Sequence, residues 1–60
     1  MNKDRVFNYV KNLAAKAQVD KLGLMKAEYH AARQLCLECD LLTFKELEQA
    51  EYQAKEHLIN

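Results

Sequence analysis

Two cysteines separated by two residues, Cys36 and Cys39, form the pattern in this sequence that most resembles a chemical site. A C-x-x-C pair can ligate zinc or work as a redox couple. A structural zinc site needs two further ligands, and the histidines of the chain are His30 and His57. If residues 25–39 form one helix, His30 points about 180° away from Cys39, so it cannot complete the site. We therefore expect no metal.

The same helix disfavours redox chemistry at the two cysteines. Activated C-x-x-C thiols lie at helix N-termini, whereas Cys36 and Cys39 fall at a predicted C-terminus, where the helix dipole opposes thiolate formation. We expect both to be thiols that pack as small apolar residues. The chain has no serine, no nucleophile beside a base and no glycine-rich loop. We expect no enzyme activity and no cofactor.

The elements that hold these residues follow from size and composition. The chain has 60 residues, no proline and one glycine, and Ala, Leu, Glu and Lys are its commonest residues, which favours helices. A chain this short buries only about 60% of the surface that it exposes when unfolded, so its own core is small. We predict a single all-α domain over residues 1–60, either a three-helix unit or a helical hairpin.

The first predicted helix covers residues 3–21. Asn2 or Asp4 is placed to cap its start. Gly23 favours a break after it, because a glycine just beyond a helix readily adopts the left-handed conformation; the alternative is one helix running through Gly23. Its apolar stripe recurs at spacings of four, three and four residues: Val6, Val10, Leu13 and Ala17.

The second predicted helix covers residues 25–39 and has a wide apolar face made of two adjacent rows. We expect it to lie between the other two helices, because a wide, alanine-rich face lets two neighbours approach closely. One row contains Leu24, Ala31 and Leu35, and the other contains Met25, Tyr29, Ala32, Cys36 and Cys39.

The third predicted helix covers residues 44–58 and has the clearest start signal in the chain. Thr43 is followed three residues later by Glu46, which is the capping-box pattern. The apolar residues behind it predict one narrow buried face: Phe44, Leu47, Ala50, Ala54 and Leu58.

The stretch from Leu35 to Leu58 resembles the short C-terminal domain family, a bacterial helical hairpin with a Gly-Leu-Ile-Thr type of turn followed by Glu-Glu-Phe. Here Leu41-Leu42-Thr43 and Glu46-Leu47-Glu48 correspond to those motifs, and Asp40 stands at the position of the turn glycine. The resemblance implies a helical hairpin that acts by oligomerisation or by docking a partner.

The zero net charge conceals two halves of opposite sign. Residues 1–26 carry six basic and two acidic side chains, a net +4, and residues 27–60 carry three basic and seven acidic ones, a net −4. Such halves attract one another within one molecule or between two. The acidic third helix would be repelled by phosphates, so nucleic acid is an unlikely partner, and a small helical DNA-binding regulator remains the alternative.

Neither a transmembrane segment nor a secretory signal is evident, and we expect a cytoplasmic protein without a membrane partner. Several apolar residues fall off the predicted stripes, which suggests an interface with another protein or a homodimer in which the basic first helix meets the acidic third helix. We predict a non-catalytic regulator, an adaptor or inhibitor of the kind that phages and mobile elements encode. The candidate interface residues are Leu37, Leu41, Leu42, Tyr52, Ile59, Glu48, Glu51, Lys11 and Lys16.

Overall fold

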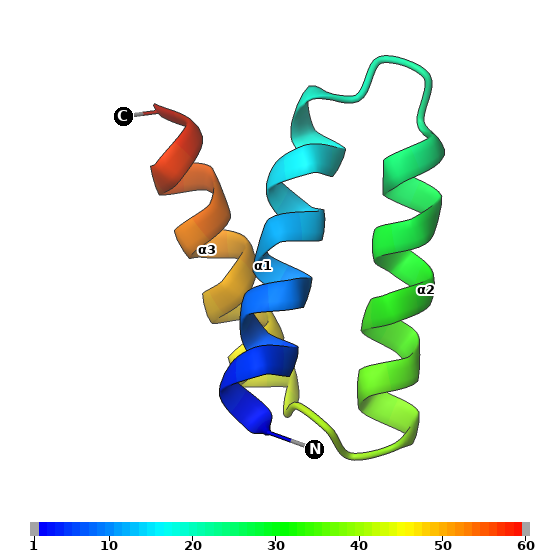
Figure 1. The fold of residues 1–60 in the computed structure, drawn as a ribbon, viewed down its shortest axis with the longest axis vertical. Helices are drawn as coiled ribbons and strands as arrows, with labels where there is room; N and C mark the ends of the chain where they lie inside the picture. Colours follow the sequence, from blue (N-terminus) through cyan, green and yellow to red (C-terminus); the bar gives the residue numbers. More distant parts are fainter. Residues whose placement is uncertain (1, 60) are drawn as a thin grey trace.

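A computed structural model of the chain describes residues 2–59, with side chains for residues 2–56. Three helices make up the fold: α1 (Lys3–Val19), α2 (Leu24–Glu38) and α3 (Phe44–Ile59). Short connections make each helix antiparallel to the one before it (Figure 1). The all-α prediction is therefore confirmed, and of the two predicted arrangements the structure has the three-helix unit and not the hairpin. The helix ends agree with the predicted ranges to within two residues.

The central helix is α1, which packs extensively against both α2 and α3. The prediction that α2 lies between the other two is wrong, because α2 and α3 make few direct backbone approaches to each other. Figure 1 shows why: α3 starts behind α1 and then diverges from α2 toward its C-terminus. With only α1 as a close neighbour, α2 buries two side chains, Tyr29 and Cys36.

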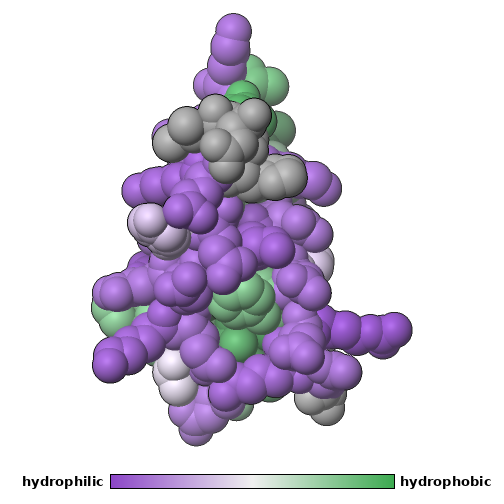
Figure 2. Space-filling model, turned by 90° about the vertical axis from the view of Figure 1, so that its left-hand side faces the viewer, coloured by the Kyte–Doolittle hydropathy of each residue, from purple (hydrophilic) through white to green (hydrophobic). Residues whose placement is uncertain are grey.

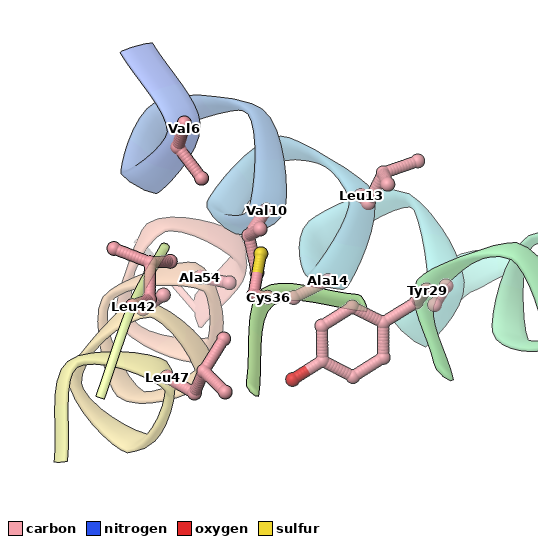
Figure 3. Packing of buried hydrophobic residues seen from close by; sticks show 11 residues of the cluster. Val6, Val10, Leu13, Ala14, Tyr29, Cys36, Leu42, Leu47 and Ala54 are labelled. Carbon is pink, nitrogen blue, oxygen red and sulfur yellow. The ribbon is translucent and has the colours of Figure 1, made fainter. Parts of the chain in front are cut away.

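The core lies where the inner faces of the three helices converge, as Figure 3 shows. Val10 and Leu47, each fully buried, are its largest completely enclosed side chains. Small residues at Ala14, Ala50 and Ala54 let α1 and α3 approach closely. The predicted stripe of α1 is confirmed, since all of its members are buried: Val6, Val10, Leu13 and Ala17.

The connection between α1 and α2 separates the two helices and caps the start of α2. Gly23 has a φ of 81° in the left-handed region, and it directly precedes α2 instead of following the last turn of α1. The Asp20 carboxylate accepts hydrogen bonds from the backbone N–H groups of Leu22 (3.2 Å) and Met25 (2.6 Å). Gly23 stands at the N-cap position of α2 but has no side-chain acceptor. The Asp20 carboxylate therefore caps the start of α2 in its place.

The connection between α2 and α3 combines a helix stop with a helix start. The N–H of Leu41 donates to the carbonyl of Cys36 at 2.9 Å, and Asp40 has a φ of 54°, the left-handed residue of a Schellman motif. Three residues later the predicted capping box is present. Glu46 accepts from the N–H of Thr43 at 2.8 Å, and the Thr43 hydroxyl accepts from the N–H of Glu46 at 3.2 Å.

Candidate functional site

An apolar groove lies between the first half of α1 and the second half of α2. Its volume is about 430 Å³, and no residue of α3 lines it. Tyr9 and Leu35 form its two walls, with 58% and 55% of their surfaces exposed. The full lining is Arg5, Val6, Tyr9, Val10, Ala32, Leu35, Cys36 and Leu41. This groove is the candidate functional site.

The groove exists because α3 packs on one side of the α1–α2 pair only. Val6, Val10 and Cys36 form its floor and belong at the same time to the core. Leu41 reaches it through the Schellman motif, in which the residue after the left-handed position packs back on the last turn of the helix. Figure 1 looks onto the side where α1 and α2 lie next to each other and α3 passes behind α1.

Charged side chains border the groove in a regular order. On α1, Arg5 and Lys16 share a helix face with Tyr9, because they are four residues before it and seven after it. On α2, Glu28 is seven residues before Leu35, and Glu38, three residues after Leu35, lies toward the outer edge of α2 that also holds Leu37. All four charged residues are exposed. The α1 border is therefore basic and the α2 border acidic.

The predicted interface residues are not gathered on one surface. Leu41 lines the groove and Lys16 borders it, whereas Leu37, 38% exposed, lies on the other edge of α2 beside His30 and Arg33. Tyr52 and Glu48 are exposed on α3, and Lys11 lies beside a polar hollow between α1 and α3. The side chain of Ile59 falls outside the described part of the chain.

Leu42 and Glu51 have internal roles in place of the predicted interface ones. Leu42 is only 2% exposed and belongs to the core, because the turn after α2 points it toward Leu47 (Figure 3). Glu51 is half-buried and accepts a hydrogen bond from the Tyr29 hydroxyl. Placing Leu42 on an exposed interface was wrong, and Glu51 already has partners within the chain.

Sequence patterning missed Leu24 and Leu35, which were assigned to the buried face of α2. They are 71% and 55% exposed, and Ala31 in the same row is exposed too. The signal was present in the width of the apolar face, since two adjacent rows exceed what one neighbouring helix covers. Because α3 leaves α2 uncovered, the row through Leu24 and Leu35 remains on the surface.

A small polar network links α2 to α3 on the side away from the groove. Glu51 accepts from Tyr29 and lies 3.6 Å from Nε of Arg33, whose guanidinium group stacks 5.3 Å from the Phe44 ring centroid. Burial, followed by the hydrogen bond to Glu51, raises the pKa of the Tyr29 hydroxyl far above its ordinary value of 10.0. The hydroxyl therefore stays protonated and donates, which makes the network structural.

The two cysteines occupy different environments. Cys36 is buried and Cys39 is exposed, and both are free thiols. Burial, with a smaller contribution from Cys39, raises the pKa of the Cys36 thiol above its ordinary value of 9.0. Cys36 is therefore a protonated, apolar part of the groove floor. No group of three His, Cys, Asp or Glu side chains within the described residues is arranged to hold a metal ion.

The side of the molecule formed by α3 is mainly polar. Figure 2 shows the face formed by α3 and the adjoining part of α1, where hydrophilic residues surround a small apolar area. The hollow between these helices, about 520 Å³, is lined mostly by polar side chains, among them Lys11, Gln49 and Glu56. The apolar groove between α1 and α2 thus differs in character from this face. None of the helices described has the length and apolar character needed to cross a membrane.

Comparison of the chain with protein-family models, with curated proteins and with solved structures gave no match.

Proposed function

We propose that the chain is a small non-catalytic protein–protein interaction module that regulates a larger protein as an adaptor or inhibitor and also self-associates. The observation that carries this proposal is the apolar groove between α1 and α2. Soluble monomers rarely leave contiguous apolar surface open without using it to bind something. In this chain the groove is continuous with exposed Leu24 and Ala31 along α2.

The composition of the groove supports protein binding. Tyr9 is a rigid, amphipathic side chain of the type that dominates binding energy at interfaces, and it lines the groove together with Leu35. Charged residues lie at the border and apolar ones on the floor, which is the usual layout of an interface. The resemblance to the short C-terminal domain family implies the same mode of action.

The lining favours binding over catalysis. Arg5 is the only charged residue among those that line the groove, and the Cys36 thiol is held protonated by burial. Acyl transfer or hydrolysis would need an activated nucleophile beside a base, and the groove lining offers no such pair. Apolar walls with one cationic edge are better suited to hold an amphipathic helix from another protein.

Affinity capture with two matched variants tests the proposal. Leu35→Lys places a charge on the groove wall, and Tyr52→Lys places the same charge on α3, at a position that is 59% exposed against 55% for Leu35. Both sites are exposed enough to leave the core intact. We expect the wild type and Tyr52→Lys to capture the same host proteins, and Leu35→Lys to lose them, as judged by quantitative mass spectrometry.

Two results would contradict the proposal. One is capture of the same proteins by Leu35→Lys and by the wild type, which would remove the groove from the interaction. The other is recovery of nucleic acid without protein, with binding that weakens steeply as salt rises, which would favour the DNA-binding alternative. Circular dichroism of each variant verifies that the helices are retained.

A further inference from the structure

We propose that the groove between α1 and α2 is covered by a second copy of this chain, in a dimer whose two-fold axis runs parallel to the helices. The inference rests on the self-association in the proposed function and assigns the groove to it, so that capture of a larger protein depends on Leu35 because formation of the dimer does. It is carried by the order of charges along the groove, which is complementary to itself in one orientation of a two-fold dimer.

The charges are placed in register by helix geometry. Tyr9 of α1 and Leu35 of α2 both line the groove. Lys16 and Glu28 each lie seven residues from that pair, about 10.5 Å along the helices in the same direction, because α1 and α2 are antiparallel. Toward the other end, Arg5 lies four residues from Tyr9 and Glu38 lies three residues from Leu35. Each end of the groove thus has a basic residue on α1 and an acidic residue on α2.

A two-fold axis parallel to the helices places α1 of one copy over α2 of the other at the same height. Arg5 then meets Glu38 of the second copy, and Lys16 meets Glu28. Tyr9 meets Leu35, so that the apolar centre closes between flanking charge pairs. Each contact occurs twice because the interface is isologous. The result is a four-helix arrangement of two layers, in which each helix is antiparallel to its neighbours, a packing that helix bundles commonly use.

The other face-to-face orientation is disfavoured by the same residues. With the axis perpendicular to the helices, α1 lies over α1 and Arg5 approaches Lys16 of the second copy. Glu28 would approach Glu38 in the same way. Like charges placed together at an interface destabilise it, so the pattern selects the parallel axis. This selection is an argument for a second copy, because an unrelated partner would not need both complementary charges on one chain.

Among the described side chains, Arg5, Lys16 and Glu28 have no ion pair or hydrogen bond, whereas Glu38 accepts a hydrogen bond from the Gln34 amide at 3.2 Å on its own helix. The ion pairs among the described side chains are Lys3 with Glu46 at 3.0 Å and Arg33 with Glu51. Lys3–Glu46 joins the basic α1 to the acidic α3 within one chain, so part of the attraction between the two halves is satisfied internally. The homodimer expected from the sequence, with α1 against α3 of its mate, is replaced here by one with α1 against α2.

A second copy on the groove side would cover large apolar side chains that are exposed on α2. Stable interfaces bury about 800 Å² on each partner. The chain exposes 4607 Å² in total, and its two longest dimensions are 29 and 23 Å. Figure 1 is viewed onto this broad side, on which α1 and α2 lie next to each other. Covering it would also bury Leu24 and Leu35, which are among the most exposed large apolar residues of the described chain.

The test uses two variants that cannot pair with themselves but can pair with each other. The acidic variant is Arg5→Glu with Lys16→Glu, and the basic variant is Glu28→Lys with Glu38→Lys. Sedimentation equilibrium at low salt measures the mass of each, against the monomer mass of 7.0 kDa. We expect a dimer for the wild type, a dissociation constant raised about tenfold or more for each variant, and a heterodimer in their equimolar mixture.

A control variant distinguishes the effect of where the charges lie from the effect of the net charge. Glu48→Lys with Glu56→Lys changes α3 and raises the net charge as much as the basic variant does, but it leaves the groove charges unchanged. We expect this control to remain a homodimer. We also expect it not to form a heterodimer when it is mixed with the acidic variant. If it forms the heterodimer as tightly as the basic variant does, net charge alone drives association and the inference fails.

A wild type that stays monomeric at the highest concentration would also overturn the inference, as would dimers that survive both double reversals. The proposed function is tested separately. If the wild type is monomeric but capture of host proteins still depends on Leu35, the groove binds a different protein, and the interaction module stands without the dimer. If the wild type dimerises through the groove but captures no host protein, the dimer is supported and the proposed regulatory function is not.

Discussion

Asp40 and Asp20 show how single residues set the two connections. Asp40 holds a left-handed φ of 54° at the end of α2, a conformation that is unfavourable for a residue with a Cβ. Asp20 caps the start of α2 from four residues before the helix, through its bond to Met25. The special position of residue 40 could be noticed in the sequence, because Asp40 departs from the glycine of the turn motif. The capping role of Asp20 could not be noticed in the sequence, because Asp20 lies outside the usual N-cap position.

Asp40→Gly is expected to stabilise the fold by about 0.5–1 kcal/mol, because glycine adopts the left-handed conformation without the steric penalty of a Cβ. Urea denaturation followed by circular dichroism measures the change. Asp40→Asn serves as the control, since it keeps the Cβ and removes only the negative charge at the C-terminal end of α2. The expectation would be refuted if Asp40→Gly were no more stable than Asp40→Asn.

The helices begin and end where their caps allow, and α3 carries the cap that responds to pH. The hydrogen bond from the Thr43 N–H lowers the pKa of Glu46 below its ordinary value of 4.5, and Lys3 at 3.0 Å lowers it further. The charged form of Glu46 therefore favours the folded state. Its contribution is complete above about pH 4.5, and it is lost as the pH falls through the lower pKa of the folded state.

Glu46→Gln should remove this part of the pH dependence. The glutamine retains an oxygen that accepts from Thr43 but cannot titrate. We expect the free energy of unfolding of the wild type to exceed that of the variant at pH 6, and the two to converge as the pH falls below 4.5. Denaturation curves at several pH values provide the measurement. Glu48→Gln, on the exposed side of α3, is the control, and an equal convergence for that variant would argue against a specific effect of the capping box.

In the whole molecule, α2 is the helix that contributes the fewest described side chains to the core. It buries Tyr29 and Cys36, whereas α1 buries five residues, and its packing is mainly against α1. Segments with few buried apolar contacts open locally at lower free energy than the rest of a fold. A second copy on the groove would cover this helix and hold it in place.

Hydrogen exchange should therefore rank the helices. We expect the amides of α2 to exchange at least about tenfold faster than the central amides of α1 and α3 in dilute protein, and to become more protected as the concentration rises. Exchange followed by mass spectrometry on peptides from each helix gives the rates. The acidic variant Arg5→Glu with Lys16→Glu should lack the concentration dependence. Uniform exchange over all three helices at low concentration would show that α2 is as firmly held as the others.

The sequence by itself determined the helical segments, the capping box at Thr43 and the inner stripe of α1, and it favoured a break near Gly23 over one continuous helix. These features follow from local periodicity and cap chemistry, which act over a few residues. Only the tertiary structure decided that α1 is the central helix, that Leu42 is buried, and that Leu35 lies on a groove wall. These depend on the direction in which α3 leaves α2, which is set by packing between residues far apart in the chain. For the same physical reason, the placement of Arg5 and Glu38 at one end of the groove, and of Lys16 and Glu28 at the other, became visible only once α1 and α2 were seen side by side.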